Sequence, residues 1–161
     1  MTIAKPGTWK SPVTPEMLSQ AGISHGFIQA FHDDVFWDES RPAENGRTVV
    51  VSRTNGDVLP APWSASTRVH EMGGLSWLVC LWNDLPGLLF AEKTDQRIYW
   101  KPVDGSPEPI TPESPPGSLS RYSDFLIRGS EIWCVREITK GHKTSRDLIA
   151  ISAPNQIRVL D

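Results

Sequence analysis

Short runs of hydrophobic residues alternate with clusters of Gly, Pro, Asn and Asp along most of the chain. Many of the runs are rich in Val, Ile, Phe and Trp, which favour strands because their side chains pack well on a pleated surface. Runs this short, separated by turn-forming residues, predict antiparallel strands joined by tight turns. The expected strands cover residues 26–31, 35–37, 48–53, 75–82, 88–92, 97–101, 123–127, 131–136 and 147–151, with a further candidate at 157–160.

One segment near the start has the pattern of a helix instead. Thr14 precedes Pro15 and Glu16, and Gly22 ends the segment. Thr is a favoured N-cap, Pro suits the first helical position, and an acidic residue in the first turn interacts well with the helix dipole. The sequence therefore predicts one short N-terminal helix over residues 14–22 in a chain that is otherwise all-β.

The strands and the turns after them recur together with a period near 50 residues. Residues 49–51, 98–100 and 148–150 are expected to be the last strand of each unit. In the turns that follow, Gly56 and Gly105 are 49 positions apart in the sequence. Such a period, with about four strands in each unit, is typical of a β-propeller blade. A β-sandwich with regularly spaced strands is the alternative, but it does not explain why the turns repeat as well.

We therefore predict a single partial β-propeller domain over residues 1–161, with three blade-like four-stranded antiparallel units at roughly 24–62, 63–112 and 113–161. Closed propellers have roughly four to eight blades, and each blade buries its faces against its neighbours. Three units do not close such a ring. The expected partners are therefore the remaining blades of a longer protein or another copy of this chain.

Composition and charge narrow the possible partners and location. The net charge of −3 argues against nucleic acid, because phosphate binding needs a clustered excess of Lys and Arg. No apolar run approaches the length of a membrane span, and the N-terminus lacks the apolar core of a signal peptide. Cys80 and Cys134 each lie in an apolar run, which indicates buried free thiols in a cytoplasmic protein rather than a disulfide.

Several aromatic and charged residues are expected to hold the fold together. Large tryptophan side chains on strands favour packing between sheets, and the four on expected strands are Trp37, Trp77, Trp100 and Trp133. In the first hairpin, Arg41 and Arg47 are placed to pair with Glu44 or Asp38. Exposed pairs of this kind contribute on the order of 0–1 kcal/mol to stability.

The sequence contains no pattern that indicates a catalytic centre, a metal site or a cofactor site. The four histidines have no metal-ligand spacing with each other or with the cysteines. No Gly-x-Ser-x-Gly elbow is present; residues 74–78 come nearest but end in Leu78. No glycine-rich phosphate loop is present either. We therefore expect no catalytic residues, no metal and no cofactor in this chain.

Arg68, His70 and Glu71 are the polar residues for which we predict substrate binding. If residues 68–72 are extended, Arg68 and His70 share one face and Glu71 lies on the other. A carboxylate suits a peptide amine, and a guanidinium suits a carboxylate or carbonyl. The alternative is structural: Glu71 pairs with Arg68 or a backbone donor, and the glycines at 73 and 74 allow a sharp bend.

Five segments, at 7–14, 41–51, 67–74, 95–99 and 134–137, resemble the propeller domain of prolyl oligopeptidase family serine peptidases. The nearest resemblance is to the bacterial acylaminoacyl-peptidase and dipeptidyl aminopeptidase group. Residues 67–74, which read TRVHEMGG, resemble the family's most recognisable propeller motif. That motif usually has Tyr where this chain has Met72, and a third Gly where it has Leu75.

The resemblance implies an N-terminal propeller that covers the active site of an α/β-hydrolase domain and filters peptides by size. Peptide chemistry then belongs to the hydrolase domain, and the peptide substrate reaches the propeller by way of that domain. This chain is expected to be the non-catalytic propeller part. The alternative is a stand-alone propeller-like binding or scaffold module, completed by oligomerisation.

Overall fold

The strands of the computed structural model, which describes residues 22–71 and 73–160, form three four-stranded antiparallel sheets that follow one another along the chain. Sheet 1 contains β1 (Ser24–Phe31), β2 (Asp34–Arg41), β3 (Arg47–Ser52) and β4 (Gly56–Asp57), with the 3-10 helix η1 (Pro42–Glu44) between β2 and β3. Sheet 2 contains β5 (Trp77–Trp82), β6 (Leu85–Ala91), β7 (Ile98–Pro102) and β8 (Glu108–Pro109). Sheet 3 contains β9 (Ser118–Arg128), β10 (Glu131–Lys140), β11 (Lys143–Ala153) and β12 (Gln156–Val159).

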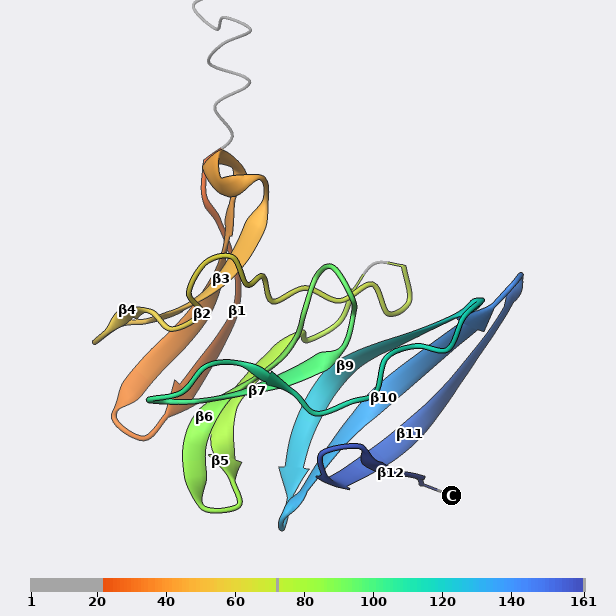
Figure 1. Ribbon diagram of the computed structural model, residues 1–161. Coiled ribbons are helices and arrows are strands. Elements are labelled where there is room, and N and C mark those ends of the chain that lie inside the picture. Colours follow the sequence, from red (N-terminus) through yellow and green to blue (C-terminus); the bar gives the residue numbers. More distant parts are fainter. Residues whose placement is uncertain (1–21, 72, 161) are drawn as a thin grey trace, which may run out of the picture.

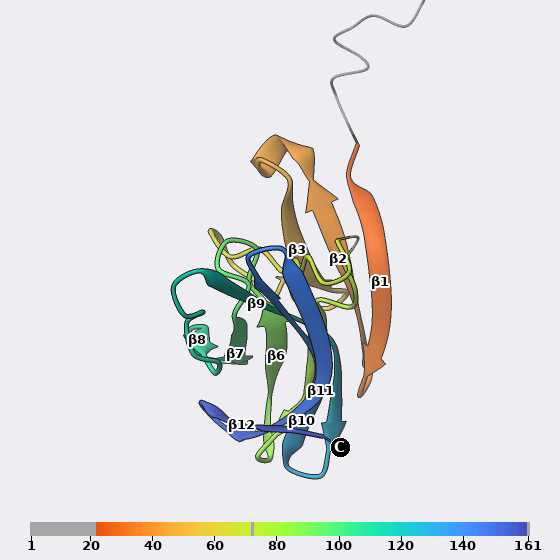
Figure 2. The same ribbon diagram turned by 90° about the vertical axis from the view of Figure 1, so that its right-hand side faces the viewer.

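Each sheet is a simple meander, and the three sheets stand side by side with sheet 2 in the middle (Figure 1). Figure 2 shows the same arrangement from the side, with sheet 3 in front. Four-stranded meanders packed face to face in chain order are the architecture of a β-propeller. The predicted fold class, an all-β partial propeller, is thus confirmed. The predicted helix over residues 14–22 lies almost wholly outside the described residues.

The position of the last strand in each unit was wrongly predicted. The strands at 49–51, 98–100 and 148–150 belong to β3, β7 and β11, which are third in their sheets. The fourth strands, β4, β8 and β12, lie in segments for which the sequence predicts mainly turns. Two of these strands contain only two residues each and include Gly or Pro, which are depleted in strands. Their pairing with β3 and β7 therefore left little trace in the sequence.

Sheet 2 is buried on both faces because successive side chains of a strand point to opposite sides. Toward sheet 1, β5 contributes Trp77 and Val79; toward sheet 3, it contributes Cys80 and Trp82. The core between sheets 1 and 2 comprises Val50, Leu59, Ala65, Trp77, Val79, Leu88, Phe90 and Tyr99. This double burial explains why the segments at 75–82 and 88–92 read as continuous apolar runs rather than as alternating patterns.

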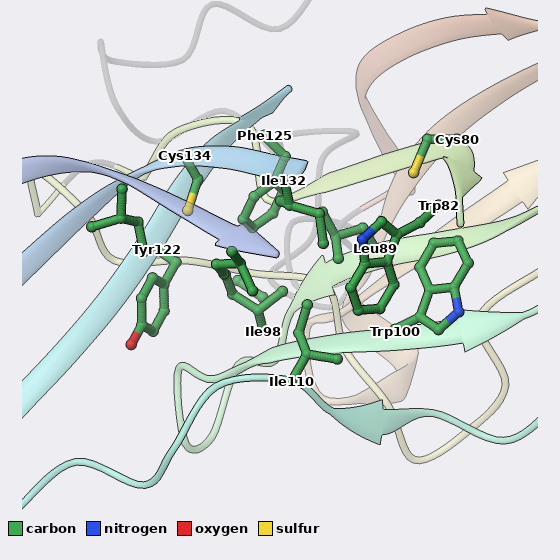
Figure 3. Packing of buried hydrophobic residues seen from close by; sticks show 13 residues of the cluster. Cys80, Trp82, Leu89, Ile98, Trp100, Ile110, Tyr122, Phe125, Ile132 and Cys134 are labelled. Carbon is green, nitrogen blue, oxygen red and sulfur yellow. The ribbon is translucent and has the colours of Figure 1, made fainter. Parts of the chain in front are cut away.

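The larger core lies between sheets 2 and 3. Figure 3 shows Leu89, Ile98 and Ile132 in the middle of this core, with Trp82 and Trp100 of sheet 2 at one end and Tyr122 of sheet 3 at the other. The cluster comprises Cys80, Trp82, Leu89, Ala91, Ile98, Trp100, Ile110, Tyr122, Phe125, Ile132, Cys134, Ile149 and Ile151. The rings of Trp82 and Trp100 meet edge to face with their centroids 5.5 Å apart, a favourable geometry for aromatic pairs. This core fixes sheet 3 against sheet 2.

Two of the four strand tryptophans pack between the described sheets as predicted, and the other two lie on faces that point away from sheet 2. Trp77 and Trp100 lie in the two inter-sheet cores. Trp37 and Trp133 lie half-buried, and the faces of β2 and β10 that carry them point away from sheet 2. The difference follows from strand alternation, because each of these two residues neighbours the residues that face the core.

Polar groups also cross the junction between sheets 1 and 2. The Gln29 side chain accepts a bond from the Val79 N–H at 2.9 Å and donates to the Val79 carbonyl at 2.6 Å, so it pairs with the backbone of β5 as a strand would. The Asp38 carboxylate accepts bonds from the indole N–H of Trp77 and the backbone N–H of Phe27, both at 2.8 Å. Asp38 thus joins β1, β2 and β5.

We predict that Asp38→Ala lowers the free energy of unfolding by about 1–3 kcal/mol, because Trp77 is 1% exposed and its indole N–H loses its partner in a buried site. Urea unfolding followed by tryptophan fluorescence measures the change. Asp104→Ala, in an exposed turn, is the matched control and should change stability by less than about 0.5 kcal/mol. Equal effects of the two substitutions would contradict the role assigned to Asp38.

Both cysteines are free and buried, as the sequence predicted. Burial raises the pKa of Cys80 to about 12, and burial also raises the pKa of Cys134. Because the thiolate is the reactive form, we predict that a thiol reagent such as Ellman's reagent labels neither cysteine in the folded chain at pH 8 and labels both in urea. Rapid labelling without denaturant would contradict the packing of this core.

Candidate functional site

The candidate site is the turn formed by the described residues 66–71 and 73 in the connection between sheets 1 and 2, which carries the three predicted substrate-binding residues. Its start is held by the 92–97 turn of sheet 2. The Arg68 N–H donates to Gln96 Oε1 at 2.8 Å, and the Gln96 amide donates back to the Ser66 carbonyl at 3.2 Å. Gln96 is 2% exposed, so its side chain serves as a buried connector between the turn and the loop.

The division of side chains between two strand faces was conditional on an extended segment, and the described residues 68–71 do not form one. His70 and Glu71 have φ angles of 58° and 62°, in the left-handed region. The Glu71 N–H donates to the Arg68 carbonyl at 3.1 Å, and the Gly73 N–H to the Val69 carbonyl at 2.9 Å. These bonds close a tight turn, so the predicted division of side chains between two strand faces does not apply.

Glycine is needed at positions 73 and 74 of the TRVHEMGG segment for two different structural reasons. Gly73 has a φ of 82°, which a residue with a side chain rarely adopts. A Cβ at Gly74 would lie 2.9 Å from Ser123 Cβ and 2.9 Å from Asp124 Oδ2, so Gly74 permits a close approach to β9. Just beyond, Leu75 and Asp124 exchange two bonds, Asp124 N–H to the Leu75 carbonyl at 2.8 Å and Leu75 N–H to Asp124 Oδ1 at 3.1 Å.

A buried carboxylate on sheet 3 holds the tip of the turn. Glu137 of β10 is 1% exposed and accepts the His70 N–H at 3.2 Å. It also pairs with Arg121 at 2.8 Å and Arg146 at 2.7 Å. Burial works to raise the pKa of Glu137, but the bonds from Arg121, the His70 N–H and Arg146 outweigh it, so the pKa lies below its ordinary value of 4.5. The carboxylate is therefore charged at neutral pH.

The turn thus presents Arg68, His70 and Glu71 to solvent while Val69 is fully buried beneath them. Within the described residues, Glu71 forms no ion pair with Arg68, one of the two partners that the structural alternative gave it. The arrangement can offer a carboxylate, an imidazole and a guanidinium to a polar ligand from one short turn. The sequence predicted a binding role for these three residues, and the structure places all three on the same exposed turn.

The residues that position the turn were not found from the sequence. Glu137 is 67 positions from His70, and Gln96 is 28 positions from Arg68 and 30 from Ser66. Arg121 supports the turn only through its pair with Glu137. A buried glutamate is rare and has no local pattern that distinguishes it from an exposed strand residue. Only the tertiary arrangement of sheets 2 and 3 reveals these contacts.

The charged residues of the first hairpin form a separate network. Arg41 pairs with Glu39, Glu44 and Asp57, at 2.7, 3.3 and 2.7 Å. Arg47 pairs with Glu44 at 2.6 Å. The predicted pairing with Glu44 is therefore confirmed for both arginines, whereas Asp38 faces sheet 2 instead.

We predict that Glu137→Ala lowers the free energy of unfolding by about 2–3 kcal/mol, because Arg121 and the His70 N–H lose a charged partner. Hydrogen exchange at the His70 amide should speed up at the same time. Because the folded-state pKa is lowered, the stability from Glu137 is complete above about pH 4.5 and is lost as pH falls further.

The control for this prediction is Glu113→Ala, whose side chain is 87% exposed and lies 3.8 Å from Arg97. It should change stability by less than about 1 kcal/mol. Unfolding curves at pH 7 and at pH 3.5 test both statements. If Glu137→Ala lowers the free energy of unfolding by the same amount at pH 7 and at pH 3.5, the stabilising role of the charged carboxylate is contradicted.

Comparisons with known proteins find relatives only among solved structures. A scan against protein families gives no match, and a search of curated proteins gives none either. In the described residues, no helix is long and apolar enough to cross a membrane.

The solved structures that resemble the chain are puromycin-hydrolysing enzymes. A puromycin-hydrolysing peptidase of Mycobacterium tuberculosis shares 33% identity over 96% of this chain, with a TM-score of 0.80. A puromycin hydrolase shares 32% identity over 100% of this chain, also with a TM-score of 0.80. A S511A mutant of puromycin hydrolase in complex with PGG shares 31% identity over 95%, with a TM-score of 0.79.

This chain spans only 26–28% of the length of these relatives. Identity above 30% together with a TM-score of about 0.8 over nearly all of the chain shows common ancestry and a common fold in the matched part. The relatives are peptidases of the prolyl oligopeptidase family, and the matched part is propeller. Over nearly all of its length the chain is therefore similar to the propeller portion of peptidases of the prolyl oligopeptidase family.

Proposed function

We propose that this chain is the part of a cytoplasmic serine peptidase that controls the access of peptides to an α/β-hydrolase domain outside the 161 residues. The observation that carries the proposal is the match to 26–28% of the length of puromycin-hydrolysing peptidases. The chain has no Gly-x-Ser-x-Gly elbow, so the nucleophile of such a peptidase would come from another part of the protein. The two buried free thiols are in keeping with a reducing compartment.

The proposed substrates are short peptides or acylated N-termini, as in the acylaminoacyl-peptidase and dipeptidyl aminopeptidase group. We assign Arg68, His70 and Glu71 to substrate contact, because their side chains are exposed on a turn that is held at both ends. Glu71 would bind the amine of a free peptide N-terminus, and Arg68 would bind a carbonyl or carboxylate. A turn held by buried partners keeps such groups in place without losing much entropy on binding.

A second candidate function is that of a binding or scaffold module without peptidase partner. The apolar residues that remain exposed on sheets 1 and 3 favour it, since such surfaces usually mark an interaction site. The coding sequence downstream of codon 161 separates the two functions. A reading frame that continues through more propeller repeats to a Gly-x-Ser-x-Gly elbow supports the peptidase, and a stop codon supports the module.

We predict that the 161-residue chain alone hydrolyses neither an aminoacyl chromogenic substrate nor puromycin.

In the full-length peptidase, Glu71→Gln should lower kcat/KM about 10- to 100-fold for a substrate with a free amine, since one charge-assisted bond contributes about 1.5–3 kcal/mol. The same substitution should leave an N-acylated substrate unaffected, because that substrate has no charged amine.

Glu113→Gln, an exposed acid outside the turn, is the matched control and should change neither substrate. If Glu71→Gln slows both substrates equally, Glu71 only supports the structure and its substrate contact is refuted. If the isolated chain hydrolyses either substrate, the assignment of catalysis to another domain is wrong.

A further inference from the structure

The packing between sheets 1 and 2 changes along the length of the strands. On the face of sheet 2 that points toward sheet 1, side chains lie in rows across β5, β6 and β7. The row that runs from Trp77 to Tyr99 lies in the closed core with sheet 1. The next row consists of Val79, Leu88 and Lys101, so it ends in a charged residue where the first row ends in an aromatic one.

Sheet 1 supplies little side-chain volume opposite this second row. The Gln29 side chain is bonded to the backbone of Val79, so the row of sheet 1 that begins with Gln29 faces the row of Val79. It continues through Phe36 to Ser52 and Gly56. Packed sheets lie about 10 Å apart, and neither serine nor glycine fills that distance. The dense packing of a normal interior therefore stops here.

The result is a cavity of about 320 Å³ between the two sheets. This volume lies in the range of roughly 300–1,000 Å³ that is typical of small-molecule sites, which are mainly apolar with a few polar groups. Both walls come from adjacent sheets within the described residues. The apolar part of the lining consists mainly of Phe31, Phe36, Val58, Val79, Leu88 and Val103.

This cavity is separate from the candidate turn. Its lining includes Phe31, at the β1–β2 turn, and Pro86, at the β5–β6 turn. Figure 1 shows these two turns at the lower end of the sheets, whereas η1 and the connection that carries the candidate turn lie above them. A ligand in the cavity would therefore occupy a second site.

Two charged residues line the cavity, and their surroundings differ. Both carboxylate oxygens of Asp57 accept bonds from Arg41 at 2.7 Å. The Lys101 ammonium instead donates to the carbonyls of Pro102 and Val103, at 3.2 and 3.1 Å. In residues 22–71 and 73–160, no ion pair joins Lys101 to an acid. The acid in the lining is thus paired, and the lysine is not.

The chemistry of Lys101 selects the charge of the ligand. An ammonium group has three donors, so the bonds to the two carbonyls leave one donor and the whole positive charge without an acidic partner. A carboxylate answers both, because a bond between two charged groups is roughly twice as strong as a neutral one. The apolar wall formed by Phe36 and Leu88 favours an apolar body on the same molecule.

We propose that the cavity binds a small organic acid, whose carboxylate pairs with Lys101 and whose apolar body, such as a phenyl ring, fills the space between sheets 1 and 2. The volume suits a free small molecule rather than a folded segment of protein. The proposal goes beyond the peptidase role, since it uses neither the candidate turn nor a hydrolase domain.

The test is a titration of the 161-residue chain with hydrocinnamate, a phenyl ring on a two-carbon chain that ends in a carboxylate. Methyl NMR spectra should show saturable shifts at Val58, Val79, Leu88 and Val103, with a Kd of about 1 mM or lower. Hydrocinnamamide, the uncharged amide of the same shape, and the cation phenylpropylamine should each bind at least about tenfold more weakly.

Lys101→Met removes the charge but keeps an unbranched apolar side chain. It should raise the Kd of hydrocinnamate at least about tenfold and change that of hydrocinnamamide by less than about twofold. Lys93→Met is the matched control, because the Lys93 ammonium also donates to a carbonyl, that of Gly46 at 2.9 Å, but lines a different cavity. It should leave both constants unchanged. Circular dichroism should show the same fold for both variants.

The absence of shifts at these methyl groups would overturn the proposal, and so would shifts spread over the whole surface. Equal binding of the acid and the amide, or an unchanged Kd in Lys101→Met, would refute the role of Lys101. If hydrocinnamate binds this chain but not the full-length peptidase, another part of that polypeptide fills the cavity and the ligand site is refuted. These readouts are binding constants, whereas the peptidase role is tested by hydrolysis, so either proposal can fail without the other.

Discussion

The burial of sheet 2 on both faces is the constraint on which the rest of this structure depends. A four-stranded meander alone buries little apolar surface, and an isolated sheet has two faces that need cover. In sheet 2 the alternation along β5 sends Trp77 toward sheet 1 and Trp82 toward sheet 3, so each neighbour packs on a complete apolar layer. Sheets 1 and 3 are placed by these two cores, and each then has a second face to be covered.

Polar bonds fix the register that the apolar cores leave free. Hydrophobic contact is non-directional, whereas the Gln29 amide meets Val79 through both of its polar atoms. At the other junction, the Trp82 indole N–H donates to the Ser130 carbonyl at 3.1 Å. Each junction therefore combines an apolar layer with a few bonds that only one relative position of the sheets allows.

The sequence was sufficient for the fold class because its signals were local. Short β-branched runs, turn residues and a period near 50 all follow from the geometry of single strands and turns. The fourth strands were missed where they consist of two residues, since Gly56 and Pro109 have no strand propensity of their own and pair only because a third strand is already in place. Strand propensity is a property of a single residue, whereas strand pairing depends on the strand beside it.

The same distinction between local signals and tertiary contacts applies to the candidate site. The chemical character of Arg68, His70 and Glu71 could be read from the sequence, but their arrangement could not. The left-handed conformation of His70 is unusual for a residue with a side chain, and its N–H is bonded to Glu137 on another sheet. A contact across 67 positions has no signature in a single sequence.

The position of the turn follows from the same packing that holds the sheets. Its start is bonded to Gln96 of sheet 2, and its tip is bonded to Glu137 of sheet 3. The turn cannot move independently of both sheets without breaking a bond to a buried partner, and the bond to Glu137 is charge-assisted and therefore the stronger one. A shift of sheet 3 against sheet 2 would, in contrast, carry Glu137 away from Gln96 and deform the turn between them. The exposed side chains of Arg68 and Glu71 are therefore coupled to the junction between sheets 2 and 3, and whatever stabilises that junction also fixes the geometry that a ligand at the turn encounters.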